Sequence, residues 1–168
     1  KLWEDDQGRK FLGDTPDEIA KRIRESNADL IGISNMFTWQ YQQALLVANI
    51  CKSISSKLIT VIGVPHASAF PKETIEETDI DFVVMGEGEH RLLELTRSLD
   101  AGAEPRIQGV LQSEKDMELL KPSRRSRISF LPELDDLPMP AYDMVDMERY
   151  FYLQRKGYSS RPRSKGNR

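Results

Sequence analysis

The sequence contains few of the residues that form covalent cross-links and metal sites. Among its 168 residues there is one cysteine, Cys51, and there are two histidines, His66 and His90. A single cysteine excludes a disulfide within the chain and any metal site that draws several cysteines from one chain. Two histidines without partner cysteines make only a weak metal site. We therefore predict no metal-binding residues, and we expect Cys51 to be inert packing within a helix.

The sequence also lacks a long apolar run, a secretory signal and an excess of positive charge. No segment approaches the length of about 20 apolar residues that a membrane-spanning helix needs. Lysine and arginine number 24 and aspartate and glutamate 27, which gives a net charge of −3. This balance offers no general attraction to nucleic acid or to anionic membranes. The sequence predicts a cytoplasmic protein without nucleic-acid or membrane partners.

Three short apolar runs predict buried strands. They are DLIGIS (29–34), LITVIGV (58–64) and the start of DFVVMGEGE (81–89). Each run is rich in β-branched residues and continuously apolar, which is typical of strands buried on both faces of a parallel sheet. A weaker run, IQGVLQ (107–112), predicts an edge strand.

Helical patterns separate these runs. Thr15, Pro16 and Glu18 form a capping-box sequence that predicts a helix start. Further helices are expected over 39–54, 71–78 and 87–99, the last ending near Gly102. Alternation of strands and helices predicts an α/β fold with an open parallel sheet flanked by helices.

The character of the chain changes after residue 112. Residues 1–112 read as the α/β domain, and 113–154, with prolines and no long periodic stretch, read as an extended connector. Residues 155–168 contain six basic residues and no acidic residue, which predicts a disordered tail.

Small, polar and glycine residues follow each of the three predicted strands. In open parallel sheets, ligands bind at the carboxyl ends of the strands, so these three segments are expected to share one binding edge. The candidate binding residues are Gly32, Ser34, Asn35 and Met36; Gly63, Val64, Pro65 and His66; and Gly86, Glu87, Gly88 and Glu89.

The residues themselves leave the ligand open. A dinucleotide fingerprint would need a glycine where Arg91 stands, and no phosphate loop of the Walker type occurs. Paired glutamates suggest acid/base chemistry in principle, but Glu87 and Glu89 by themselves fit a helix-starting turn better. We predict no catalytic residue.

Other residues near these strand ends have both a functional and a structural interpretation. His66 is placed to contact a ligand, whereas His90 fits a surface position in the first turn of a helix. Trp39 and Tyr41 either frame a ligand or pack, as aromatic residues that open a helix usually do.

The three segments together resemble a known family. IGISNMFTWQ, VIGVPHAS with FPKETIE, and DFVVMGEGEHRLLEL resemble, in order and spacing, the cobalamin-binding domain that precedes the catalytic barrel in radical S-adenosylmethionine enzymes. LPELDDLPMPAYDMVDMERY resembles the connector that these proteins use between the two domains. The resemblance covers roughly residues 14–160.

The resemblance implies a flavodoxin-like fold that binds cobalamin with its nucleotide tail in the sheet edge. Gly32 and Gly63 would leave room for the tail, and Ser34 with Met36 takes the place of the family's Ser-x-Leu. In the family's glycine pair, Val64 replaces the second glycine. Gly86 and Gly88 would let the backbone pass close to the cofactor, while Glu87 and Glu89 would cap the next helix or bond to cobalamin amides.

The two ends of the chain depart from the family pattern. Family members begin with a central strand and helix, followed by a second strand, and KLWEDD resembles the end of that second strand. The first strand is therefore expected to be missing and DLIGIS to form a sheet edge. The Cys-x-x-x-Cys-x-x-Cys motif that binds a 4Fe-4S cluster is absent, and RPRSKGNR stands there instead. The cluster and S-adenosylmethionine are therefore expected only in a full-length parent, and the catalytic domain is an absent or separate partner.

Two functional hypotheses from other classes stay open beside the leading one. The leading hypothesis is a cobalamin-binding module of a radical S-adenosylmethionine enzyme of the methyltransferase type, catalytically incomplete in this form. A flavodoxin-like regulatory or protein-interaction domain without cofactor is the main alternative. A flavin-binding electron-transfer domain is the third, although the loop rich in Ser, Thr and Gly that it needs after the first strand is absent.

Overall fold

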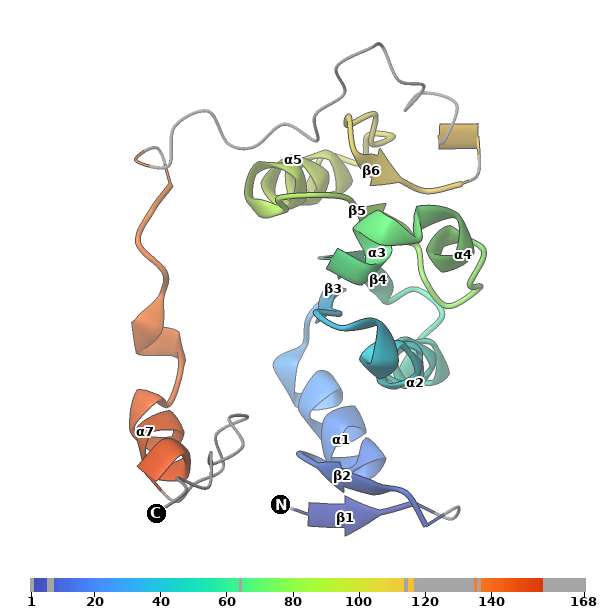
Figure 1. Ribbon diagram of the computed structural model, residues 1–168. Helices are drawn as coiled ribbons and strands as arrows, with labels where there is room; N and C mark the ends of the chain where they lie inside the picture. Colours follow the sequence, from blue (N-terminus) through green and yellow to red (C-terminus); the bar gives the residue numbers. More distant parts are fainter. Residues whose placement is uncertain are drawn as a thin grey trace, which may run out of the picture. The chain divides into compact units, whose positions relative to one another are not determined.

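Helices and strands alternate through most of the chain, as the apolar runs predict. The computed structural model describes residues 2–5, 8–63, 65–113, 115–116, 135 and 137–155 (Figure 1). The chain divides into two compact units, residues 1–131 and residues 132–168. Val64, one of the candidate binding residues, lies outside the described residues.

The first unit contains a four-stranded sheet with the order β3-β4-β5-β6. Strands β3 (Leu30–Ser34), β4 (Ile59–Gly63) and β5 (Phe82–Val84) are parallel, and β6 (Val110–Leu111) runs antiparallel to β5. The predicted flavodoxin-like α/β fold is confirmed, including the weak edge strand within 107–112.

Strand β3 lies at the other edge of this sheet. Within the described residues it pairs only with β4, in a register that joins Leu30 to Ile59 and Ser34 to Gly63. This is the edge position that the sequence predicts for the DLIGIS run.

Helices cover the two faces of the sheet unequally. Helices α2 (Tyr41–Ile54), α3 (Pro65–Ala69) and α4 (Pro71–Ile75) share one hydrophobic cluster with the sheet residues Ile33, Ile62, Val83 and Leu111. On the other face, α5 (Glu89–Asp100) supplies Leu95 and Leu99, which pack with Val61, Phe82 and Val84. Figure 1 shows α5 on the opposite side of the sheet from α2 and α4.

Helix α1 (Pro16–Ser26) begins as its sequence predicts. The Thr15 amide donates to Glu18 Oε2 at 2.8 Å, and the Glu18 amide donates to Thr15 Oγ1 at 3.3 Å, so the capping box is complete. Its last turn ends at Asn27, whose φ of 50° is left-handed. The helix packs against α2.

The strand expected at KLWEDD is present as β1 (Leu2–Glu4), but other features were not predicted from the sequence. Strand β1 pairs with β2 (Lys10–Leu12) in a separate antiparallel hairpin, in which Trp3 and Phe11 stack with their ring centroids 4.5 Å apart. In the second unit, η3 (Tyr142–Met144) and α7 (Met147–Arg155) lie within the segment expected to be an extended connector. No helix in the described ranges is long and apolar enough to cross a membrane.

Cys51 lies on the buried face of α2 with Ala44 and Ala48. Burial raises the pKa of its thiol above the usual value, which disfavours the reactive thiolate. The predicted packing position is confirmed.

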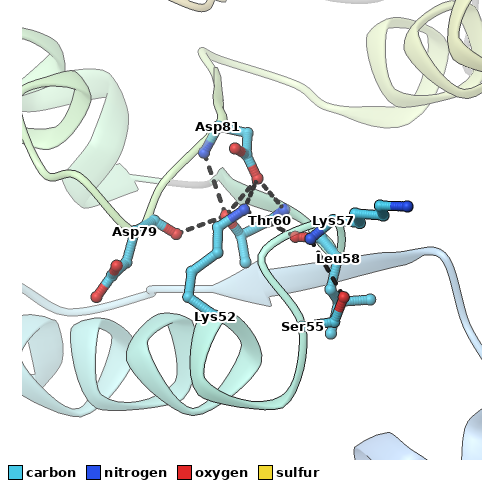
Figure 2. A network of polar contacts seen from close by, with 7 residues as sticks. All are labelled: Lys52, Ser55, Lys57, Leu58, Thr60, Asp79 and Asp81. Atoms are coloured by element: carbon cyan, nitrogen blue, oxygen red, sulfur yellow. Dashed lines mark hydrogen bonds and ion pairs between the residues drawn. The ribbon is translucent and has the colours of Figure 1, made fainter.

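A polar network at the amino ends of the strands joins α2, β4 and β5 (Figure 2). Asp81, the residue before β5, accepts hydrogen bonds from Lys52 Nζ at 2.5 Å and from the Thr60 amide at 2.7 Å. Lys52 Nζ also donates to Leu58 O at 2.8 Å, and Thr60 is fully buried with its hydroxyl 2.6 Å from Asp79 O. This network fixes where β4 and β5 start relative to each other.

We expect Asp81→Asn to lower the free energy of unfolding by about 1–2 kcal/mol, because the amide loses the charge that faces Lys52 and presents donors to other donors. The lower part of that range is favoured, since the Asp81 side chain is 35% exposed and its ion pair is screened by water. Urea unfolding measures the change. Asp100→Asn, at the exposed end of α5, is the control, and an equal effect in both variants would contradict the role of the network.

Candidate functional site

The register of the parallel strands brings the three predicted segments to one edge. Ser34 is paired with Gly63, and Gly63 is paired with Val84, so the carboxyl ends of β3, β4 and β5 are adjacent. The pairing continues one residue further, where the Asn35 amide donates to Gly63 O at 3.3 Å. The candidate residues that follow these strands therefore share a single edge.

On the face that α5 covers, the carboxyl ends of β3 and β4 carry almost no side chain. Gly32, Ser34 and Gly63 point to this face, because side chains alternate along a strand and Leu30 and Val61 pack on the same side. Gly32 and Ser34 are exposed, and a Cβ added at Gly32 meets no atom within 4 Å. We call these three residues the uncovered strip.

A groove lies on the same face, toward the amino ends of the strands. A cavity of about 560 Å³ lies between the second half of α5 and the first residues of β3 and β4. Leu30, Ile59 and Leu99 supply apolar walls, and Thr96 adds a hydroxyl. Asp29, Arg97 and Asp100 also line it. A largely apolar cavity with a few polar groups is the usual form of a small-molecule site.

Sequence reasoning missed the helical wall of this groove. The signal was present, since Leu92, Leu95, Thr96 and Leu99 follow the spacing of one helix face. That spacing locates the inner face of α5, but it cannot show that the helix leaves the carboxyl ends of β3 and β4 uncovered.

The β5–α5 loop brings Gly86, Glu87 and Gly88 to the same edge. Gly86 has a φ of 66°, which glycine adopts without strain, and its amide donates to Ser68 Oγ at 2.8 Å. Gly88 is the N-cap of α5 and makes no side-chain hydrogen bond, and the role expected of Glu87, a helix cap or a bond to cobalamin amides, stays a prediction. Glu89 stands in the first turn, where a carboxylate favours the helix dipole.

Asn35 is buried behind the edge formed by the carboxyl ends of the strands, instead of lying on its surface. Its side chain is 1% exposed, and its Nδ2 donates to Phe37 O at 3.0 Å, which shapes the turn after β3. Within the described part of the chain, no hydrogen-bond partner reaches its Oδ1. A buried acceptor without a partner is costly, so this atom marks a place that a ligand group or water satisfies.

His66 is also buried, with 6% of its surface exposed. Its ring lies between Tyr41 and Phe70, at centroid distances of 4.2 and 5.1 Å, and its Nδ1 lies 3.2 Å from Thr38 Oγ1. Its Nε2 has no hydrogen-bond partner among the described residues. The structure thus places His66 in a packed aromatic cluster, and a contact with ligand stays a prediction.

The aromatic residues after β3 differ in their exposure. Tyr41 packs on His66, and burial raises the pKa of its phenol. Trp39, by contrast, is 73% exposed and lies beside exposed Met36 and Phe37. Pro65 is exposed at the start of α3, and His90 is exposed in the first turn of α5.

Across the described ranges, no group of three or more His, Cys, Asp or Glu side chains is arranged to hold a metal ion. The site therefore consists of glycine backbone, a serine hydroxyl, buried amide groups and an apolar groove. These groups suit a large ligand with an apolar part and hydrogen-bonding groups.

Comparison with known proteins identifies the family. The family model described as the B12 binding domain matches residues 10–96, which is more than half of the chain. The chain belongs to the B12-binding domain family. The match includes the uncovered strip and the β5–α5 loop, and it supports a cobalamin-binding module.

Curated relatives carry the domain within longer proteins. The chain is 29% identical to the cytidylyl-2-hydroxyethylphosphonate methyltransferase of Streptomyces wedmorensis over 98% of its own length, and 34% identical to an uncharacterised methyltransferase of Pyrococcus horikoshii over 79%. It is 23% identical over 82% of its length to the anaerobic magnesium-protoporphyrin IX monomethyl ester cyclase of Rubrivivax gelatinosus. The chain spans 33%, 28% and 25% of these proteins, respectively. No solved structure matches it.

We expect Ser68→Ala to destabilise the β5–α5 loop. The substitution leaves the Gly86 amide without its side-chain acceptor, which costs about 1 kcal/mol in the free energy of unfolding. Urea unfolding and amide exchange at Gly86 measure the effect. Ser53→Ala, on the exposed face of α2, is the matched control, and protection of Gly86 that survives Ser68→Ala would contradict this role.

Proposed function

We propose that the chain is the cobalamin-binding module of a cobalamin-dependent radical S-adenosylmethionine enzyme of the methyltransferase type. The observation that carries the proposal is the uncovered strip at the carboxyl ends of β3 and β4, inside the segment that matches the B12 binding domain. Two of the relatives are named as methyltransferases, which supports the reaction class.

The residues present fit cobalamin. Gly32 and Gly63 would let the nucleotide tail lie against backbone on the uncovered strip, and the Ser34 hydroxyl, exposed on the same strip, would offer a hydrogen bond to a ring nitrogen of the tail's base. The apolar groove with Leu30, Ile59 and Leu99 lies on the same face, toward the other end of the strands.

The segments that follow β3 and β5 would hold the wider part of the cofactor. Backbone groups of the Gly86–Gly88 loop suit its peripheral amides, and exposed Met36 supplies apolar contact. When bound, cobalamin supplies a cobalt centre that carries an alkyl group. The chain's own residues would bind and orient it and exclude water from its tail.

The proposed partner is a radical S-adenosylmethionine catalytic domain, which would hold the 4Fe-4S cluster and S-adenosylmethionine. Met36, Phe37 and Trp39 are 52%, 53% and 73% exposed beside the strand ends. Such a cluster of large apolar side chains favours a covered surface. A protein-interaction domain without cofactor would use the same surface, so cofactor binding has to be measured directly.

We expect purified protein to bind hydroxocobalamin with a shifted absorbance spectrum. Ser34→Leu should weaken binding at least about tenfold, because the variant loses a hydrogen bond and fills the uncovered strip. Ser53→Leu, which places the same side chain on the exposed face of α2, should bind as the wild type does. Folded protein, checked by circular dichroism, that leaves the cobalamin spectrum unchanged would favour the interaction domain.

Gly32→Val separates binding from folding more sharply. A Cβ at this position meets nothing within 4 Å, and valine suits a strand, so thermal stability should be unchanged or slightly higher. Cobalamin affinity should nevertheless fall at least about tenfold, because the side chain occupies the place of the tail. Unchanged affinity in a folded Gly32→Val variant would show that the tail does not lie on the uncovered strip.

A further inference from the structure

One arginine joins the β5–α5 loop to the segment before β6. Arg91, in the first turn of α5, donates from Nη1 to Glu87 O at 2.7 Å and from Nε to Gln108 O at 2.8 Å. Both acceptors are main-chain carbonyls, so the guanidinium fixes the course of two backbone segments that are distant in sequence. The first of these segments is the Gly-Glu-Gly-Glu loop of the proposed cofactor site.

Gly109 provides the space that this side chain occupies. Its φ is +85°, and a Cβ added there would lie 2.6 Å from Arg91 Nε, closer than atoms can approach. Its carbonyl also accepts the Met85 amide at 2.8 Å, just before the loop. Gly109 thus combines a left-handed backbone, a vacant side-chain position and a direct bond to the end of β5.

We propose that Arg91, packed against Gly109, is a positioning residue that holds the 86–89 loop in the conformation used for cofactor binding. The proposal rests on the proposed function, because it assigns the loop to the cobalamin site. Preorganising a loop removes the entropy cost of ordering it when the ligand binds. Arginine suits this role better than lysine, because its planar fork directs several donors at once to separate carbonyls.

The position of Arg91 also explains a departure from the dinucleotide fingerprint. A third glycine at position 91 would leave Glu87 O and Gln108 O without these bonds. Arg91 therefore breaks the dinucleotide fingerprint and, in the same position, holds the 86–89 loop by two hydrogen bonds.

The test compares Arg91→Gln, Arg91→Lys, Gly109→Ala and the double variant Arg91→Gln with Gly109→Ala. Arg24→Gln removes the same charge from an exposed position in the last turn of α1 and is the matched control. Amide exchange of Met85 and Gly86 is measured in the free protein, and the Kd for hydroxocobalamin is measured by absorbance. Thermal melting establishes that each variant is folded, and Arg91→Lys carries the test if Arg91→Gln does not fold.

We expect Arg91→Gln and Gly109→Ala each to speed exchange at Gly86 and to weaken cobalamin binding about tenfold. Arg91→Lys should fall between Arg91→Gln and wild type, and Arg24→Gln should match wild type. The double variant should lose less than the sum of the two single variants, because both substitutions disturb the Arg91 contact, while Gly109→Ala also strains the left-handed backbone at that position.

Fully additive losses in the double variant, or unchanged exchange at Gly86 in Arg91→Gln, would overturn the proposed positioning role of Arg91. Equal losses in Arg24→Gln would show that the effect comes from the loss of a positive charge, and would overturn the proposal as well. A wild-type chain that binds no cobalamin would instead reject the cofactor role of the loop. The exchange experiment separates these failures, because it needs no ligand.

Discussion

The Asp81 carboxylate is the group on which the geometry of the sheet depends. It receives Lys52 from α2 and the Thr60 amide from β4, and it immediately precedes β5. Three elements are thereby aligned at the amino ends of the strands. Since a strand of fixed length transmits its starting point to its far end, this alignment also decides that Gly63 lies beside Val84 at the carboxyl ends.

The site arises because the helices cover the sheet incompletely. One face is closed by α2, α3 and α4, whereas among the described helices only α5 packs on the other, against β4, β5 and β6. The exposed end of β3 would be costly if it carried large apolar residues, but Gly32 and Ser34 occupy it. The surface that a ligand would meet is therefore backbone and one hydroxyl, which permits close approach at the expense of stability.

Sequence reasoning predicted the elements whose signals are local. Thr15 and Glu18 predicted the start of α1, and the β-branched runs predicted the parallel strands, because capping and buried-strand patterns act within a few residues. The hairpin around Trp3 and Phe11 was missed, since its strands are three residues long. Helix α7 was missed because no long periodic pattern surrounds it.

The candidate site was predicted less completely than the fold. The strand ends could be found from the order of the elements, but the burial of Asn35 and His66 depends on how α2 and α3 pack. Arg91 had no signal in one sequence, since its two acceptors are carbonyls that only the folded chain brings together. Side-chain contacts between distant segments are the part of a site that composition and spacing do not reveal.

The edge position of β3 links ligand binding to solubility. Its outer backbone groups offer a template on which another extended chain can add, and Leu30, Ile31 and Ile33 make that edge apolar. Gly32 and Ser34 belong to the same strand, so a ligand seated on them would stiffen it and favour the native form by mass action. Without such a ligand, the β3 edge would be freer to pair with other chains, so the protein would be more prone to aggregate.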